Sequence, residues 1–135
     1  MIIKGLVEYN NNGALTEKRF EFDTTSKSAK PDYDICDAIA FTVYGKTIYQ
    51  NIINPDLGVP FISINLECNG KIANVVRQPE YLRRTAFGTT YLTKEIFSIE
   101  TENTEYNSLS CEKYYELLKE YVDISFDEFV SIFKS

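Results

Sequence analysis

The Asn69-Gly70 pair within "VPFISINLECNGKIANVV" constrains the fold more than any other short stretch of this sequence. Asn-Gly is the preferred dipeptide of the two-residue type I′ turn, because both residues tolerate positive φ angles. Such a turn places apolar residues opposite one another on one face, namely Leu66 with Ala73 and Ile64 with Val75. Asn65 and Asn74 then meet on the other face. The sequence therefore predicts a β-hairpin over residues 59–76 that buries one face.

The N-terminal residues predict a second hairpin, over residues 2–22. Residues 2–9 are rich in strand formers, and an Asn-Asn-Gly turn follows at residues 11–13. The return strand alternates, with Phe20 and Phe22 on one face and charged residues on the other.

Helical signals occupy the middle and the end of the chain. "DYDICDAIAFTVYG", residues 32–45, predicts a buried helix that Asp34 caps and Gly45 ends, with a buried strand as the alternative. Apolar residues recur at helical spacing over residues 110–122 and again after Ser125. Ser125 and Glu128 form the S-x-x-E pattern of a capping box. We expect residues 77–88 to form an irregular connection and residues 89–100 to form one further strand.

The order of these segments favours an α+β fold, because strands precede the last helices and do not alternate with them. At 135 residues, the chain is predicted to form a single domain, residues 1–135. We expect an antiparallel sheet of about five strands, one central helix, and two C-terminal helices packed on the same face of the sheet.

The absence of histidine removes the Ser-His-Asp and Cys-His nucleophile pairs and every imidazole metal ligand. The three cysteines are far apart, so we expect neither a metal knuckle nor a disulfide framework, and we interpret each as a small buried apolar residue. No cofactor or metal is predicted. No signal peptide or membrane span is predicted either, and a reducing cytoplasm is the expected location.

Two short motifs have structural interpretations. "YGKT", residues 44–47, ends like a phosphate-binding loop, but it lacks the first glycine of that pattern and predicts a helix-ending turn. "PDYD", residues 31–34, could contribute carboxylates to a metal site, but no suitable carboxylate and lysine follow it, so a helix cap is the preferred interpretation.

The net charge of −6 is concentrated near the C-terminus, where residues 101–135 contain eight acidic and three basic residues. A chain with this balance should repel nucleic acid and anionic membranes and attract basic proteins.

The strongest candidate for a binding surface is a row of glutamates at i, i+4 and i+8 in the first C-terminal helix. Like charges at this spacing destabilise a helix slightly, so a function would explain their presence. A solvated helix face is the simpler alternative. The candidate partner-binding residues are Glu112, Glu116, Glu120, Asp123, Glu102, Glu105 and Tyr115.

A basic cluster, "RQPEYLRR", is the alternative candidate. It suggests a pocket for a small anionic ligand or a phosphate group. Pairing of its arginines with the protein's own carboxylates is the simpler interpretation. The candidate ligand-binding residues are Arg77, Arg83, Arg84 and Tyr81.

In its size, acidity and lack of catalytic motifs, the chain resembles small acidic inhibitors, such as bacterial toxin-immunity proteins and phage proteins that block host defence. The resemblance implies a non-catalytic protein that binds a basic toxin or nuclease. A phage-encoded anti-defence (anti-CRISPR-like) inhibitor is a second possibility. An anion-binding or enzymatic domain and a subunit of a larger assembly are further alternatives.

Overall fold

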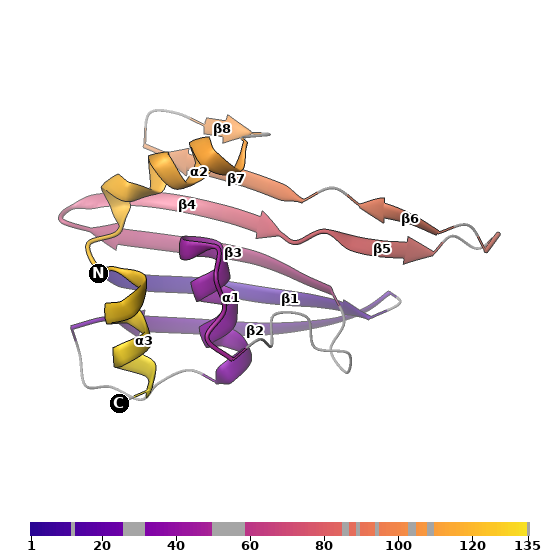
Figure 1. Ribbon diagram of the computed structural model, residues 1–135, viewed down its shortest axis with the longest axis horizontal. Coiled ribbons are helices and arrows are strands. Elements are labelled where there is room, and N and C mark those ends of the chain that lie inside the picture. The colour runs from indigo at the N-terminus through magenta and orange to yellow at the C-terminus, as the bar shows by residue number, and fades with distance from the viewer. Residues whose placement is uncertain are drawn as a thin grey trace.

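The long sheet and its covering helices account for most of the protein (Figure 1). The computed structural model describes residues 1–11, 13–25, 32–49, 59–84, 87–88, 90–93, 95–102, 105–107 and 110–134. Within these residues, an antiparallel sheet has the strand order β2-β1-β3-β4-β7-β8, and β5 and β6 form a separate two-stranded sheet. The sheet strands are β1 (Ile2–Asn11), β2 (Ala14–Asp23), β3 (Val59–Cys68), β4 (Lys71–Gln78), β7 (Ile96–Thr101) and β8 (Glu105–Asn107).

The hairpin predicted over residues 59–76 is confirmed. Asn69 and Gly70 have φ angles of 52° and 78°, as a type I′ turn requires. Leu66 pairs with Ala73 and Ile64 with Val75, and all four are buried on one face. On the other face, the side-chain amide of Asn65 donates to Asn74 Oδ1 at 2.8 Å.

The N-terminal hairpin is also confirmed, because β1 pairs with β2 along its full length. β1 also pairs with β3, which joins the two hairpins into one sheet. Buried residues alternate along β3, where every second residue from Pro60 to Cys68 faces the core. This alternation leaves one face of the sheet for the helices to cover.

Three helices pack on that face (Figure 1): α1 (Tyr33–Tyr44), α2 (Cys111–Leu118) and α3 (Phe126–Lys134). A 3-10 turn, η1 (Lys119–Tyr121), follows α2 directly, so the first C-terminal helix is shorter than predicted. The capping box of α3 is confirmed. Glu128 N donates to Ser125 Oγ and Ser125 N donates to Glu128 Oε1, each at 3.2 Å. The α+β fold with a central helix and two C-terminal helices is therefore as predicted.

The connection over residues 77–88 was wrongly predicted as irregular. β4 continues to Gln78, and β5 (Tyr81–Arg84) then pairs with β6 (Thr90–Thr93). The single strand predicted over residues 89–100 is two strands, β6 and β7. The β5–β6 hairpin extends beyond the end of the main sheet in Figure 1, and near its tip Phe87 is 95% exposed. Each strand of this hairpin is four residues long. Such a short strand shows too little apolar–polar alternation to be told from a loop in the sequence.

The caps of α1 also differ in part from the prediction. Gly45 ends the helix with a φ of 73°, and its amide donates to the Phe41 carbonyl, as expected. Asp34 does not cap the helix, because Asp32 is the N-cap residue and makes no side-chain capping bond. Asp34 is instead buried, and its carboxylate accepts from Lys18 Nζ at 2.7 Å and from the Tyr9 hydroxyl at 3.2 Å. These two bonds connect α1 to the β1–β2 hairpin.

Candidate functional site

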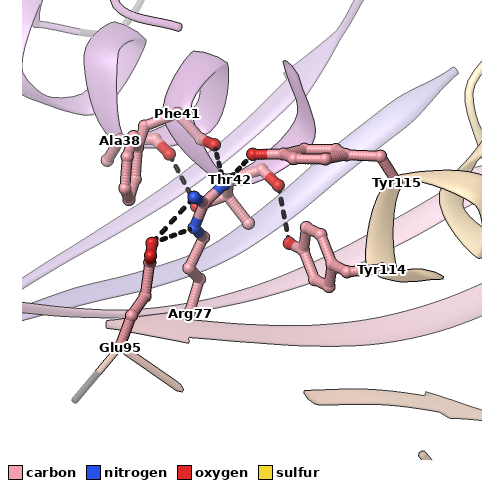
Figure 2. Close-up of polar contacts among 7 residues, drawn as sticks. All are labelled: Ala38, Phe41, Thr42, Arg77, Glu95, Tyr114 and Tyr115. Atoms are coloured by element: carbon pink, nitrogen blue, oxygen red, sulfur yellow. Dashed lines mark hydrogen bonds and ion pairs between the residues drawn. The ribbon is translucent and has the colours of Figure 1, made fainter. Parts of the chain in front are cut away.

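Arg77 lies in the protein interior, where β4 meets α1 and α2. Its side chain is 4% exposed. The guanidinium donates from Nε and Nη2 to Glu95 Oε1, at 2.9 and 2.7 Å. Its Nη1 donates to the Phe41 carbonyl at 2.6 Å and also to the Tyr115 hydroxyl. Figure 2 shows these groups converging on the guanidinium from separate elements. These bonds use four of its five N–H donors.

Aromatic rings surround the same guanidinium. Its Cζ lies 3.8 Å from the ring centroid of Phe41 and 4.5 Å from that of Phe97. The rings of Tyr115 and Tyr114 are 5.4 and 5.6 Å away. Cation–π attraction and the ion pair with Glu95 together offset the cost of burying the charge. Arg77 is thus a structural residue, and it is not available to bind an external anion.

The other members of the proposed anion pocket lie in a different sheet from Arg77. Arg83, Arg84 and Tyr81 belong to β5, in the separate hairpin. Their side chains lie outside the described part of the protein. The described residues form no anion pocket centred on Arg77, and the pairing of this arginine with one of the protein's own carboxylates is observed directly.

Tyr114 and Tyr115 connect α2 to the end of α1. The Tyr114 hydroxyl donates to the Thr42 carbonyl at 2.6 Å, and burial raises the pKa of Tyr114 well above its usual range. Burial also raises the pKa of Tyr115, against the opposing charge of Arg77. The Tyr115 hydroxyl lies against Gly45, where a Cβ atom would overlap it. Tyr115, predicted to bind a partner, therefore has its hydroxyl engaged inside the protein.

The predicted acidic residues lie at the surface, and we call them the acidic surface. All six are exposed: Glu102, Glu105, Glu112, Glu116, Glu120 and Asp123. In the part of the chain that the structure describes, ion pairs within 4.0 Å join Lys18 to Asp34, Arg19 to Glu17, and Arg77 to Glu95. None of these pairs involves Glu112, Glu116 or Glu120, so these exposed carboxylates have no ion-pair partner within 4.0 Å among the described residues.

The structure brings some of these carboxylates together and separates others. Glu112 and Glu116 are one turn apart on α2, whereas Glu120 lies in η1, so the predicted three-residue row is not one continuous helix face. Glu120 and Glu102 line one depression of about 200 Å³, with Lys71 beside them. Glu105 of β8 lies opposite Glu100 of β7 in the strand register. By strand alternation from buried Ile99, Glu105 faces away from the helices.

Asp123 contacts the side chain of a buried sheet residue, Cys68. Burial and the charge of Asp123 raise the pKa of the Cys68 thiol, which hydrogen-bonds to this carboxylate. Cys68 and Cys36 are buried as predicted, and burial raises the pKa of Cys36 to about 12. Cys111 is exposed, which contradicts its assignment to the core. Its position at the first residue of α2 explains the difference, since no preceding turn covers it.

A partly apolar hollow beside the acidic surface was not predicted. It has a volume of about 300 Å³ and is lined by Val43, Tyr44, Tyr115, Leu118, Lys119, Val122 and Ile124. The apolar stripe at helical spacing over residues 110–122 was its sequence signal. Of that stripe, only Tyr115 was predicted to belong to a binding surface, and in the structure both Tyr115 and Val122 are partly buried. The stripe thus has one edge in the core and one edge open to solvent.

Buried carboxylates in α1 have structural partners. Asp37 Oδ1 accepts from the backbone amides of Ile48 at 2.6 Å and Tyr49 at 2.8 Å. Asp34 pairs with Lys18, as described above. No group of three or more metal-ligating side chains occurs among the described residues. No helix in the same residues is long and apolar enough to cross a membrane.

No family model, curated protein or solved structure matches this chain.

Proposed function

We propose that this protein is a non-catalytic inhibitor that binds a basic protein through its acidic surface. One observation carries the proposal: Glu112, Glu116 and Glu120 are exposed with no cation within ion-pair distance among the described residues, next to a partly apolar hollow. The buried carboxylates of α1, in contrast, have donors that explain them. Charges that do not stabilise the fold are available to a partner.

The physical role of such a surface is to attract and orient a positively charged partner. Complementary potentials raise association rates and disfavour partners of the wrong charge. The hollow adds apolar area, which supplies the affinity that exposed charges alone do not. Acidic groups beside a partly apolar hollow together form the binding surface that we propose.

The partner that we propose is a toxin or nuclease that acts on nucleic acid. Proteins of this class carry a basic site for the phosphate backbone. An acidic protein that covers such a site blocks access of the nucleic acid, as a toxin-immunity protein does. A phage inhibitor of host defence would use the same chemistry. The free cysteines are consistent with action in a reducing cytoplasm.

The test is a pull-down from the native host with the parent protein and a Glu112→Lys, Glu116→Lys, Glu120→Lys variant. A matched control carries Glu17→Lys, Glu21→Lys and Glu80→Lys, which changes the net charge equally at exposed positions outside the acidic surface. We expect parent and control to capture one basic protein at low salt, and the first variant to lose it. High salt should weaken the capture, because salt screens exposed charges.

Inhibition must accompany capture. The purified partner should lose its activity on nucleic acid when the parent protein is added, and keep it with the Glu112, Glu116 and Glu120 variant. Equal loss of capture by both triple variants would show that only net charge matters. Capture that is insensitive to salt and to both triple variants would rule out the acidic surface as the binding site.

A further inference from the structure

The β5–β6 hairpin carries an aromatic residue that makes almost no contact with the rest of the protein. Phe87 is 95% exposed, the largest exposed fraction among the large apolar residues that the structure describes. Gly88 beside it has a φ of 82°, a backbone conformation that other residues rarely adopt. A phenylalanine in this position buries no apolar area and so adds nothing to the stability of the fold. A contact with another molecule would explain it.

The base of the hairpin holds it in a fixed direction. β4 and β7 pair as far as Gln78 and Ile96, directly before the hairpin begins. Arg77 and Glu95 lie on the two sides of this base, and their ion pair of 2.7 Å joins them. β5 and β6 then pair along their whole length. A hairpin fixed in this way presents Phe87 with little loss of conformational entropy on binding.

The hollow between α1 and α2 has the size and chemistry of a site for an aromatic ring. Its volume of about 300 Å³ exceeds that of one side chain, and its walls are four aliphatic side chains and two tyrosine rings. Aromatic rings pack favourably on such walls. Among the described residues, Lys119 supplies the only charged side chain of the lining. An ammonium group attracts the face of a ring, as Lys46 Nζ does at 5.2 Å from the ring centroid of Phe126.

The walls of this hollow are held in place from behind. The Tyr44 hydroxyl donates to the Ile124 carbonyl at 2.8 Å, which joins α1 to the segment before α3. The Tyr44 ring also packs on Phe129, with ring centroids 5.5 Å apart. On the other side, Arg77 donates to the Tyr115 hydroxyl. Both aromatic walls are therefore formed before an occupant arrives.

The exposed ring and the hollow cannot meet within one molecule. Figure 1 shows the β5–β6 hairpin pointing away from α1 and α2, whose residues line the hollow. A second copy of the chain can supply the ring, and charge favours that copy. Residues 79–95 contain three basic and two acidic residues, whereas the whole chain has a net charge of −6. The segment that presents Phe87 is therefore attracted to the acidic body of another copy.

We propose that the hollow receives Phe87 of a second copy of this chain. The inference goes beyond the proposed function, because it concerns self-association and needs no other protein. The ring lies between the tyrosine walls, and the ammonium group of Lys119 lies over its face. Exchange of Phe87 in both directions closes a dimer, whereas exchange in one direction builds a chain of copies. In either case one aromatic residue anchors the contact.

The first test is sedimentation of the purified protein from low to high micromolar concentration. We expect the parent to associate as its concentration rises and Phe87→Ser to remain monomeric. Leu15→Ser is the matched control, because Leu15 is also apolar and is 62% exposed on another hairpin. It should associate as the parent does. A parent that stays monomeric throughout, or equal association of Phe87→Ser, would overturn the inference.

A mixing experiment tests the contact itself. Val122→Trp places a large side chain in the hollow, at a partly buried residue with an extended backbone, and this variant should be monomeric alone. Its Phe87 is intact, whereas Phe87→Ser retains an open hollow. A mixture of the two variants should therefore form a heterodimer. A mixture that stays monomeric would contradict the proposed contact.

A charge variant tests the role of the amine without changing the apolar walls. Lys119→Gln should weaken self-association about threefold, because it removes the cation from the lining. Lys113→Gln makes the same change in net charge at an exposed residue of α2 outside the lining. It should leave association unchanged. Equal weakening by both variants would show that net charge, and not the hollow, controls association.

Phe87→Trp provides a direct signal, because the chain contains no tryptophan. Its fluorescence emission should shift to shorter wavelength as the ring leaves water and enters the hollow. At low concentration, an excess of the Phe87→Ser variant should produce the same shift, since its hollow is open. Emission that does not change under either condition would overturn the inference.

These experiments use the purified protein alone, so their outcome is separable from that of the proposed function. A monomer that still captures and inhibits a basic protein would overturn the Phe87 contact and leave the inhibitor function standing. Self-association through Phe87 without capture of any basic protein would support the contact and overturn the inhibitor function.

Discussion

Arg77 and the glutamates of the acidic surface are the two charged regions that the sequence singled out, and the fold uses them in opposite ways. Arg77 is 4% exposed and bonded to Glu95, Phe41 and Tyr115. Glu112 and Glu116 are exposed, and the described residues place no cation within ion-pair distance of either. The first region holds three elements together, whereas the second contributes little to holding them.

The difference shows that burial and partners decide what a charge does. A buried cation needs partners within the fold. Removing one member of a buried ion pair leaves the other buried without a partner, which destabilises the folded protein. An exposed charge is already satisfied by water, and its removal changes stability little. Substitution at Arg77 should therefore lower the free energy of unfolding more than substitution of the exposed glutamates. The opposite order would show that the comparison is wrong.

The largest effect should follow Arg77→Met. The substitution keeps the apolar stem but leaves Glu95 and the Phe41 carbonyl without their cation. We expect a loss of about 3 kcal/mol in the free energy of unfolding, the lower end for a broken buried pair, since Glu95 is partly exposed. Urea denaturation measures it. Arg77→Met with Glu95→Leu should recover part of the loss, and a single-variant loss below about 1 kcal/mol would contradict a structural role.

Removing the tyrosine hydroxyls should have intermediate effects. Tyr114→Phe leaves the buried Thr42 carbonyl without its donor and should cost about 1–2 kcal/mol. Tyr115→Phe removes one of several acceptors of Arg77, so its cost should be smaller. Thermal unfolding of both variants under the same conditions gives the ranking. The reverse ranking would indicate that the Tyr115 contact carries more of the stability of the cluster than the Tyr114 bond.

Ser125→Ala tests an exposed polar group that does stabilise the fold. It removes the hydroxyl that accepts from Glu128 N, and we expect a loss of about 1 kcal/mol, typical of an N-cap. Ser131→Ala is the matched control, because Ser131 lies within α3 and donates only to the Asp127 carbonyl. It should be neutral or slightly stabilising, as alanine favours helices. Equal losses would argue against the capping box.

The smallest effect should follow Glu112→Gln, Glu116→Gln and Glu120→Gln together. We expect the free energy of unfolding to change by about 0.5 kcal/mol or less, because exposed charges rarely stabilise a fold. Chemical denaturation at low and high salt measures this change. A loss above about 2 kcal/mol would place these residues with Arg77 as structural groups, and the proposed binding surface would lose its support.

Features that depend on neighbours in sequence could be predicted. The Asn69-Gly70 turn sets the register of its own hairpin, and the contact of Asn65 with Asn74 follows from that register. The capping box of α3 is likewise local, because Ser125 and Glu128 are three residues apart. These predictions required only backbone geometry and side-chain spacing.

Features that depend on distant contacts could not be predicted. The partners of Arg77 come from residues 41, 95 and 115, and no local pattern brings them together. Asp34 was predicted to cap α1, yet it lies in the first turn of the helix and pairs with Lys18 in a strand. The hollow was missed for the same reason. Which residues of an apolar helix stripe are buried depends on the elements that pack against the helix, and these come from distant parts of the chain. The exposure of the acidic residues could be expected, but their division among α2, η1 and β8 could not.

The contacts of α3 also determine when the protein can complete its core during synthesis. Phe133 packs on Phe22 with ring centroids 4.9 Å apart, and Phe129 packs on Tyr44. The ribosome therefore releases the sheet strands and α1 well before the residues that cover them. Until α3 emerges, Phe22 and the end of α1 remain open to water and to other nascent chains. Newly made protein should depend on chaperones most in the interval just before α3 emerges.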